Sequence, residues 1–220
     1  MCGRFLLTAS AHRLAGHFGV EELRTVPPRY NLAPGQLAAG LALDSNGVRR
    51  LGVLKWGFVP HWAPDPKKAP INARAETAAD KPFFADSLRH RRCLMPADGF
   101  YQWQRQGRRK RPFCIRLWDD RPFAFAGLWD VWQGQAGGPL ATFCILTTEA
   151  NELVRPVHAR MPVIVPERYY DLWLSREVRE PGELAPALRP YPADAMQAFL
   201  VGPAVNDPKK DGPECLQPAA

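Results

Sequence analysis

The sequence lacks any long uninterrupted run of apolar residues. Arg4, His12, Arg13 and His17 fall within the first twenty residues, so the apolar segment that a secretory signal requires is missing there. No later stretch approaches the ~20 consecutive apolar residues that a membrane-spanning helix needs. We therefore expect a soluble, cytoplasmic protein without a membrane partner.

Paired cysteines are also missing. The five cysteines are scattered and form no Cys-x-x-Cys spacing, which argues against disulfides, a zinc site or a redox couple. We expect neither a metal nor an organic cofactor. Cys114 and Cys144 lie in apolar runs that predict buried strands. Cys2 stands apart, because it directly follows the initiator methionine.

Repeats of fixed period and low-complexity tracts are absent too, and the 23 prolines are spread through the chain. This pattern predicts many short strands joined by loops. We expect one α+β domain over 1–207, built on a curled, mainly antiparallel, barrel-like sheet with a few flanking helices, and a loosely held tail over 208–220. Hairpins are predicted to turn at Asn46–Gly47, 105–111 and 134–139, and helices to cover 9–18, 73–91 in two parts, 166–175 and 182–188.

Acidic residues are fewer than basic ones, 22 against 29, which gives a formal net charge of +7 and a pI near 9.4. This balance favours a polyanionic partner, with nucleic acid first, although solvated surfaces are also often basic. The most basic run, 105–112, is expected to form a solvated hairpin turn rather than a specific phosphate site.

The start of the chain, MCGRF, offers unusual chemistry. Loss of the initiator methionine would leave Cys2 with a free α-amine beside its thiol. An α-amine titrates at about 7.7–8.0, so a useful fraction is unprotonated at neutral pH. The amine can attack an aldehyde to form a Schiff base, and the tethered thiol can then close a thiazolidine ring. From its position alone, an incidental terminal cysteine is the simpler interpretation.

Two polar pairs with the same spacing enter apolar stretches. Asn72 and Arg74 would point to one side of an extended segment, as a hydrogen-bonding amide and an anion clamp. His158 and Arg160 repeat the spacing, with a proton-transfer group and a phosphate-binding group. Taken singly, each pair is more often a capped loop or an ion pair, but two together are harder to dismiss.

Aromatic residues gather in the Pro-rich stretch 55–66, where Trp56, Phe58 and Trp62 are flanked by lysines. This composition is typical of a surface that stacks on the bases of single-stranded nucleic acid. A Trp-rich loop is as often a lid over a core, and both interpretations stay open.

Several stretches taken together resemble the SRAP family, named for SOS-response-associated peptidases. They follow the family order and span nearly the whole chain, which makes the resemblance specific. They are MCGRF at the start, RYNLAPGQ (29–36), KWGFVPHWA (55–63), INARAET (71–77), RRCLMPADGFYQW (91–103), HARMPVIV (158–165) and VGPAVND (201–207).

The resemblance implies a single domain, monomeric and nucleoid-associated, that senses abasic sites in single-stranded DNA and crosslinks to the sugar aldehyde through Cys2. It implies that Asn72 and His158 assist around the sugar. The family name implies self-removal of the leading residue, yet only Met1 precedes Cys2, so a cellular aminopeptidase suffices. The expected DNA-binding residues are Arg4, Asn31, Trp56, Trp62, Arg74 and Arg160.

One position departs from the family pattern. The resemblance places a catalytic glutamate where this chain has Gln102. A carboxamide can form hydrogen bonds but cannot carry a proton at neutral pH. We expect Gln102 to position the sugar while His158, Glu76 or Asp98 carries the proton.

Two alternatives come from other functional classes. A non-covalent single-strand binding module predicts salt-sensitive binding without an adduct that survives denaturation. An N-terminal-nucleophile peptidase or amidase would use Cys2 with His158. A Schiff base at the sugar also permits β-elimination, so weak lyase activity is an expected side reaction.

Overall fold

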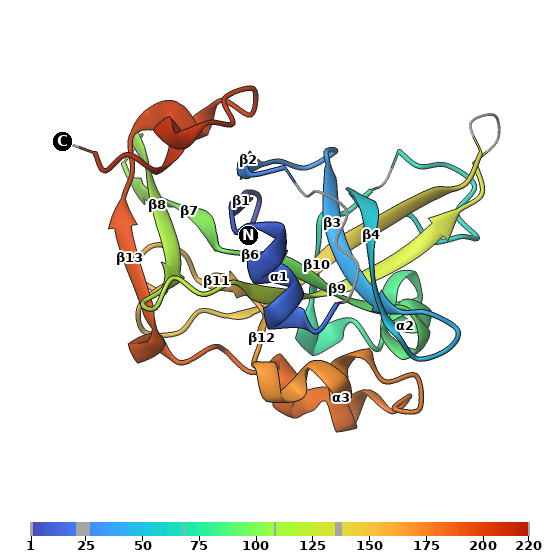
Figure 1. Cartoon of the computed structure of the whole chain (residues 1–220). Helices are drawn as coiled ribbons and strands as arrows, with labels where there is room; N and C mark the ends of the chain where they lie inside the picture. Colours follow the sequence, from blue (N-terminus) through green and yellow to red (C-terminus); the bar gives the residue numbers. More distant parts are fainter. Residues whose placement is uncertain (1, 21–26, 68, 108, 135–137, 220) are drawn as a thin grey trace.

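Two β-sheets form the frame of the molecule (Figure 1). The computed structural model describes residues 2–20, 27–67, 69–107, 109–134 and 138–219. In the first sheet, β1 joins β2 to the long β7–β8 hairpin through antiparallel pairs. Its strands in spatial order are β13 (Met196–Leu200), β8 (Arg109–Leu117), β7 (Gly99–Gln106), β1 (Phe5–Leu7) and β2 (Arg29–Leu32).

The second sheet curls into a closed ring. Strand β10 pairs with β4 at one side and with β9 at the other, so the path β10–β4–β3–β6–β9 returns to β10. Only the pairs of β10 with β4 and β5 are parallel among those described, which confirms the predicted curled, mainly antiparallel α+β fold. The strands are β3 (Leu37–Leu43), β4 (Arg49–Trp56), β5 (Asn72–Arg74), β6 (Arg92–Ala97), β9 (Phe123–Trp132), β10 (Leu140–Glu149), β11 (Arg160–Pro162) and β12 (Ile164–Val165).

The predicted hairpins reflect local turn chemistry. Between β3 and β4, the Asp44 carboxylate accepts a hydrogen bond from the Asn46 amide, and Gly47 takes φ 76°, a conformation that favours glycine. The second predicted hairpin joins β7 to β8, with Gly107 at φ 59°. Strands β9 and β10 pair as the third requires, while its turn residues 135–137 lie outside the described chain.

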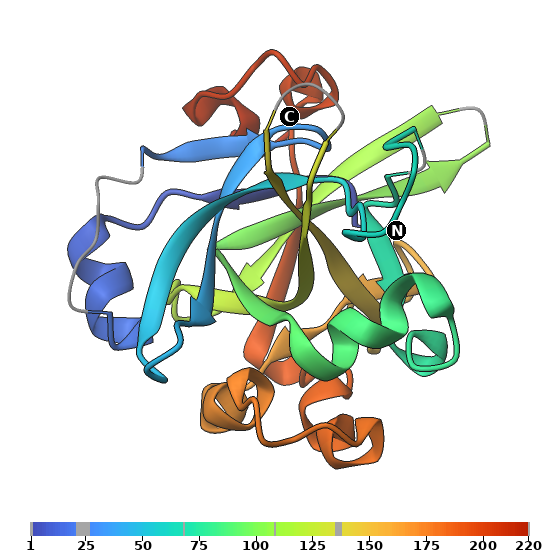
Figure 2. The same ribbon diagram turned by 90° about the vertical axis from the view of Figure 1, so that its right-hand side faces the viewer.

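Helices flank the sheets and cover little of them (Figure 2). Helix α1 begins after Ser10, whose hydroxyl accepts from the Arg13 amide, and ends at Gly19 in the left-handed region. No helix in the described parts of the chain is long and apolar enough to cross a membrane. The helices are α1 (Ala11–Phe18), η1 (Ala75–Thr77), α2 (Pro82–His90), η2 (Glu167–Tyr169), α3 (Tyr170–Leu174), η3 (Pro181–Leu188), η4 (Ala193–Ala195), η5 (Pro203–Asn206) and η6 (Pro213–Leu216).

Two helix predictions need correction. The expected first part of the 73–91 helix is instead strand β5 followed by a single 3-10 turn, because β5 pairs in parallel with β10. The 182–188 segment is a 3-10 helix that contains Pro186, a residue without the amide hydrogen that an α-helix needs.

Aromatic side chains join the two sheets in the core. Phe5 of β1 packs edge-on against Trp56 and Phe125, with ring centroids 5.1 and 5.7 Å apart. Trp56 is only 1% exposed and stacks on Phe143, and Phe58 is also buried. Trp56 therefore belongs to the core, and its contact with DNA stays a prediction. All five cysteines are free and buried, including the two predicted in buried strands.

The tail is packed rather than loose, which corrects the sequence prediction. The Asp211 carboxylate pairs with Arg29 and accepts hydrogen bonds from the Tyr30 and Asn31 amides at 2.7 Å. Cys215 is fully buried in a small cluster with side chains of the first sheet. These contacts fix the segment because they satisfy backbone donors of β2 and bury apolar surface.

Candidate functional site

A pocket of about 690 Å³ opens beside the β7–β8 hairpin. Its charged lining side chains are basic, and no acidic side chain of the described chain lines it. A pocket of this charge favours an anionic ligand. The lining residues are Arg4, Gln102, Trp103, Arg105, Lys110, His158 and Asn206.

Cys2 lies fully buried just before β1, and neither Cys2 nor Asn72 is among the residues that line the pocket. The Asn72 side-chain amide donates to the Cys2 carbonyl at 2.7 Å, and the Cys2 Sγ lies 3.8 Å from the Arg4 carbonyl oxygen. The Tyr101 amide donates to the same Arg4 carbonyl, so the chain before β1 continues along β7 toward Gln102. Burial raises the pKa of the Cys2 thiol to about 12, which keeps the thiol protonated at neutral pH.

Asn72 carries a second feature of interest. Its Oδ1 atom is buried and has no hydrogen-bond partner in the described chain. An unpaired buried acceptor beside Cys2 is costly, and a donor on a bound ligand or on the Cys2 amine would satisfy it.

Gln102 and His158 meet at the backbone of Arg160. The Gln102 side-chain amide donates to the Arg160 carbonyl at 3.1 Å. His158 Nδ1 lies 3.0 Å from both the amide nitrogen and the carbonyl oxygen of Arg160, so the ring finds a partner as acceptor or as donor. Burial, together with the chain's positive N-terminal charge, lowers the pKa of His158, so the imidazole is neutral at pH 7.

The Arg160 side chain is occupied by an acidic partner. Its guanidinium forms a bidentate ion pair with Glu76, with two contacts of 2.8 Å, and also donates to the Thr147 carbonyl. Hydrogen bonding to Arg160 lowers the pKa of Glu76, so its carboxylate stays ionised and is a poor proton carrier near neutral pH. The ion pair between Arg160 and Glu76 fixes the strand whose backbone contacts Gln102 and His158.

Arg4 and Asn31 hold the end of the chain against the first sheet. The Arg4 guanidinium donates to Asn31 Oδ1 and to the Val205 carbonyl, at 2.8 and 2.7 Å. Asn31 is fully buried, and its amide donates to the carbonyls of Asp207 and Lys210. Asn31 therefore fixes residues 205–210 to β2, and its contact with DNA stays a prediction. Arg4 lines the pocket and also packs against this segment.

Asp98, the predicted proton carrier, and Arg74, the predicted phosphate-binding residue, both lie outside the pocket lining. Asp98 is buried at the β6–β7 turn, where it accepts from the Thr8 hydroxyl and the Ala9 amide at 2.8 Å. Asp98 does not line the pocket, and its role as a proton carrier stays a prediction. Arg74 is exposed on β5, where its backbone pairs with β10, and its side chain makes no hydrogen bond or ion pair within the described chain.

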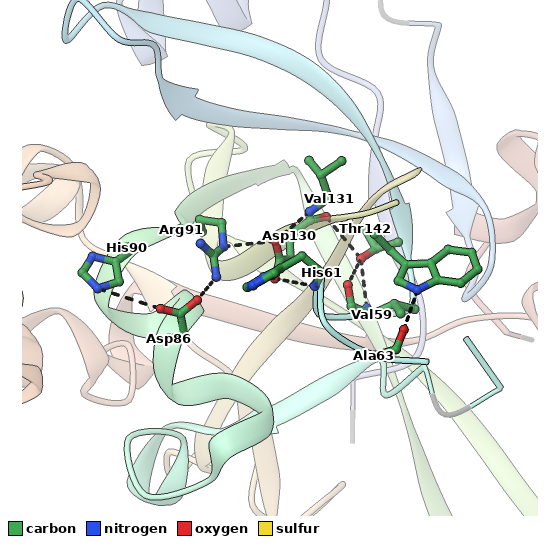
Figure 3. A network of polar contacts seen from close by, with 10 residues as sticks. Val59, His61, Ala63, Asp86, His90, Arg91, Asp130, Val131 and Thr142 are labelled. Carbon is green, nitrogen blue, oxygen red and sulfur yellow. Dashed lines mark hydrogen bonds and ion pairs between the residues drawn. The ribbon is translucent and has the colours of Figure 1, made fainter. Parts of the chain in front are cut away.

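Trp62 remains a candidate for base stacking, because it is 51% exposed. Its ring packs edge-on against Phe83 of α2. The surrounding loop is anchored by Asp130, a buried residue that accepts from the backbone amide and the Nδ1 of His61, both at 2.9 Å. Figure 3 shows His61 and Arg91 directed at this carboxylate, and the Arg91 Nε lies 3.1 Å from it.

Further hydrogen bonds fix the same loop to β9 and β10 (Figure 3). The Thr142 hydroxyl accepts from the Val59 amide at 2.9 Å, and the Trp132 indole donates to the Ala63 carbonyl at 2.8 Å. The loop is therefore held on both sides of Trp62, and its exposed ring is presented by a fixed backbone.

Four residues that line the pocket are not predicted from the sequence. Trp103 donates through its indole to Asn206 Oδ1 at 2.7 Å, and both lie within stretches that carry the family resemblance. Arg105 and Lys110 belong to the basic run 105–112, which the sequence predicts to be a solvated turn, and both line the pocket. A hairpin that turns at Gly107 pairs Arg105 with Lys110 across the two strands, and this glycine is the sequence signal that could have predicted their contact.

Comparison with known proteins identifies the family. A family model described as SOS response associated peptidase (SRAP) matches residues 1–208. The chain belongs to the SRAP family. This SRAP chain is 40% identical to the abasic site processing protein YoqW of Bacillus subtilis (strain 168), with 99% of each chain covered. It is 30% identical to the abasic site processing protein YedK of Escherichia coli (strain K12), over 99% of this chain and 100% of the relative.

Relatives of the SRAP chain extend to vertebrates and to solved structures. The abasic site processing protein HMCES of Gallus gallus is 33% identical over 87% of this chain and 66% of its own length. An X-ray structure of a protein from Bacteroides thetaiotaomicron matches with a TM-score of 0.89 at 25% identity over 100% of both chains. A protein from Bordetella bronchiseptica matches with a TM-score of 0.80 at 26% identity, over 91% of this chain and 100% of its own.

Proposed function

We propose that this SRAP protein processes abasic sites in single-stranded DNA by forming a covalent crosslink through Cys2 after loss of Met1. The observation that carries the proposal is the position of Cys2, whose carbonyl is held by Asn72 and which stands two residues before Arg4. Arg4 lines a basic pocket together with Gln102 and His158. The names of the relatives, abasic site processing proteins, support the same substrate. The proposal includes a protein that acts as a monomer in the cytoplasm, at the nucleoid, where its DNA substrate lies.

The reaction uses both nucleophiles of Cys2. An abasic sugar opens to an aldehyde at C1′, to which the unprotonated α-amine adds. The carbinolamine loses one water to give the imine. The Cys2 Sγ then adds to C1′ while its proton passes to the nitrogen, which closes the thiazolidine without an oxidant or reductant. Because the thiol pKa is raised to about 12, the amine attacks first and the thiol reacts once the imine lies beside it.

Proton transfer in these steps is assigned to His158. With Nδ1 donating to the Arg160 carbonyl, Nε2 carries the lone pair and can accept a proton from the reacting groups. The resulting cation keeps its Nδ1 hydrogen bond and can return the proton from Nε2 to the departing hydroxyl of the carbinolamine. Gln102 contributes hydrogen bonds, because its carboxamide cannot take this role.

Contacts with the flanking DNA are assigned to exposed groups. The Arg74 side chain has no hydrogen-bond or ion-pair partner in the described chain and offers a phosphate clamp beside Asn72. Trp62 offers a ring face to a base, a contact of about 1–3 kcal/mol in single-strand binding proteins. Arg160 contributes mainly through its backbone, since Glu76 occupies its guanidinium.

The test is denaturing gel electrophoresis after incubation with single-stranded DNA that carries one abasic site. Loss of Met1 is first confirmed by intact mass. We expect a shifted band that requires the abasic site and disappears in Cys2→Ala. Cys2→Ser keeps the amine and lacks the thiol, so its adduct should survive only after borohydride reduction and should be accompanied by strand cleavage through β-elimination.

A second control keeps Cys2 but blocks its amine, through an N-terminal extension that the aminopeptidase does not remove. No band is expected from this protein. Salt-sensitive binding of the unblocked protein without any band would contradict the crosslink and support a non-covalent binding module. Cys2-dependent cleavage of a peptide without abasic DNA would instead support an N-terminal-nucleophile peptidase.

A further inference from the structure

The β7–β8 hairpin places two basic residues directly opposite each other. Arg105 and Lys110 are cross-strand partners in the antiparallel register, so their side chains share one face of the hairpin. Both are exposed, and both line the pocket that Gln102 and His158 also line. Figure 2 shows the hairpin reaching outward beyond the neighbouring strands.

The charge of this pair is not balanced within the described chain. Neither side chain forms an ion pair or a hydrogen bond there, and the sequence 103–113 contains no Asp or Glu. Like charges directly opposite each other on adjacent strands are destabilising. An anion placed between Arg105 and Lys110 would remove this repulsion, and both side chains face the space where the proposed substrate lies.

We propose that Arg105 and Lys110 bind backbone phosphates of the DNA strand on one side of the abasic sugar. This inference rests on the proposed function, and it adds a binding element outside the reacting centre. Arg105 lies three residues from Gln102 along β7, or roughly 10 Å at the rise of a β-strand. The pair is therefore beyond the sugar itself and within reach of the neighbouring phosphates.

The opposite face of the same hairpin provides a matched control. Side chains alternate between the two faces of a strand, so Arg109 and Arg111 point away from the face that carries Lys110. They are exposed and do not line the pocket. The double variants Arg105→Gln/Lys110→Gln and Arg109→Gln/Arg111→Gln therefore lose the same charge from the same hairpin.

The first measurement is equilibrium binding to single-stranded DNA with a tetrahydrofuran abasic analogue, which lacks the aldehyde and cannot crosslink. We expect Arg105→Gln/Lys110→Gln to bind on the order of tenfold more weakly at low salt, with the slope of log K against log salt reduced by about 1.4. The Arg109→Gln/Arg111→Gln variant should bind within about twofold of the unmodified protein. Equal weakening by both variants, or by neither, would overturn the proposal.

The second measurement places the abasic analogue near either end of the oligonucleotide. Because the hairpin binds one flank, the Arg105→Gln/Lys110→Gln defect should disappear on the oligonucleotide that lacks that flank and persist on the other. A defect of equal size on both would overturn the one-sided placement.

Crosslinking with a true abasic site separates this proposal from the proposed function. We expect the pocket-face variant to need more DNA for half-maximal rate and to keep the rate at saturating DNA. Absence of any crosslink in the unmodified protein would reject the proposed chemistry, while the binding measurements would still decide the role of the hairpin.

Discussion

At the scale of single residues, Gln102 shows how one side chain is matched to its neighbour. Its amide group donates to the Arg160 carbonyl, the same carbonyl that faces His158 Nδ1. A glutamate in this position could make that contact only in its protonated form, because an ionised carboxylate would place a negative oxygen against a carbonyl oxygen. The surroundings would therefore raise the carboxyl pKa, toward the range useful for acid catalysis.

We predict that Gln102→Glu crosslinks faster than the unmodified protein at pH 6–7, by roughly a hundredfold, the lower end of the usual range for general acid catalysis. The carboxyl group introduced at position 102 would act beside His158 and protonate the hydroxyl group that leaves the carbinolamine as water. Single-turnover rates from denaturing gels measure the effect, with Gln104→Glu on the same strand as the control. No acceleration would mean that proton transfer at this position does not limit the reaction.

A second prediction concerns the pH dependence of crosslinking. The α-amine of Cys2 must be unprotonated, with an ordinary pKa of about 7.7–8.0. His158 must also be neutral, and its pKa is lowered from 6.5, so its active form is lost only as the pH falls below that value. The rate should thus rise with pH, and log rate against pH should have a slope of about two on the acid side of both groups.

His158→Gln should lower the rate and reduce that acid-side slope to about one, because only the amine then titrates. His61→Gln, which removes a histidine outside the pocket, should keep the slope of the unmodified protein. A slope unchanged by His158→Gln would assign proton transfer to another group.

At the scale of elements, the loop between β4 and β5 depends on groups far away in the sequence. Asp130 of β9 is 3% exposed and holds the loop through two hydrogen bonds from His61, while Arg91 balances its charge. Removing one partner of such a buried network costs more than removing an exposed ion pair. The loop that presents Trp62 is therefore fixed by the barrel beneath it.

We predict that Asp130→Asn lowers the free energy of unfolding by about 1–3 kcal/mol, through the loss of charged hydrogen bonds to His61 and the pair with Arg91. Thermal denaturation measures this as a lower Tm, by roughly 2–4 °C per kcal/mol for a chain of this size. Binding to the abasic analogue should weaken as well. The control is Asp65→Asn in the same loop, where an exposed pair with Lys67 should contribute little. Lower stability with unchanged binding would remove Trp62 from the DNA-binding surface.

Local chemistry made some elements predictable and left others open. The Asn46–Gly47 turn could be inferred because its conformation is set by the residues within it. Trp56 and Trp62 share one aromatic stretch, and their burial differs because β4 carries only the first into the core. Strand β5 was missed for the same reason, since three residues become a strand only where β10 offers an edge.

At the scale of the whole molecule, both ends of the chain converge on the pocket. Arg4 binds the carbonyl of Val205, and Asp211 caps the amides of Tyr30 and Asn31. For residues 208–220 the sequence predicts a loosely held tail. Their packing could not be inferred from composition, because polar and Pro-rich sequence is also typical of free tails.

We predict that Asp211→Ala lowers the free energy of unfolding by about 1–3 kcal/mol, because two buried-strand amides lose their acceptor and Arg29 loses its partner. Urea unfolding measures the change. Asp207→Ala, which removes only a local turn hydrogen bond to the Lys209 amide, should fall within about 0.5 kcal/mol of the unmodified protein. Equal stability of both variants would show that the tail contributes little to folding.

The burial of Cys2 sets an order of events during synthesis. In the folded chain the Cys2 side chain is buried, and β1 is paired with β7, which begins at Gly99. A ribosome adds about 5–20 residues per second, so roughly 5–20 s pass before β7, the strand that pairs with β1, has been made. We expect an aminopeptidase to remove Met1 from the nascent chain within that interval. A protein that folds before Met1 is removed would be complete in structure and yet lack its proposed nucleophile.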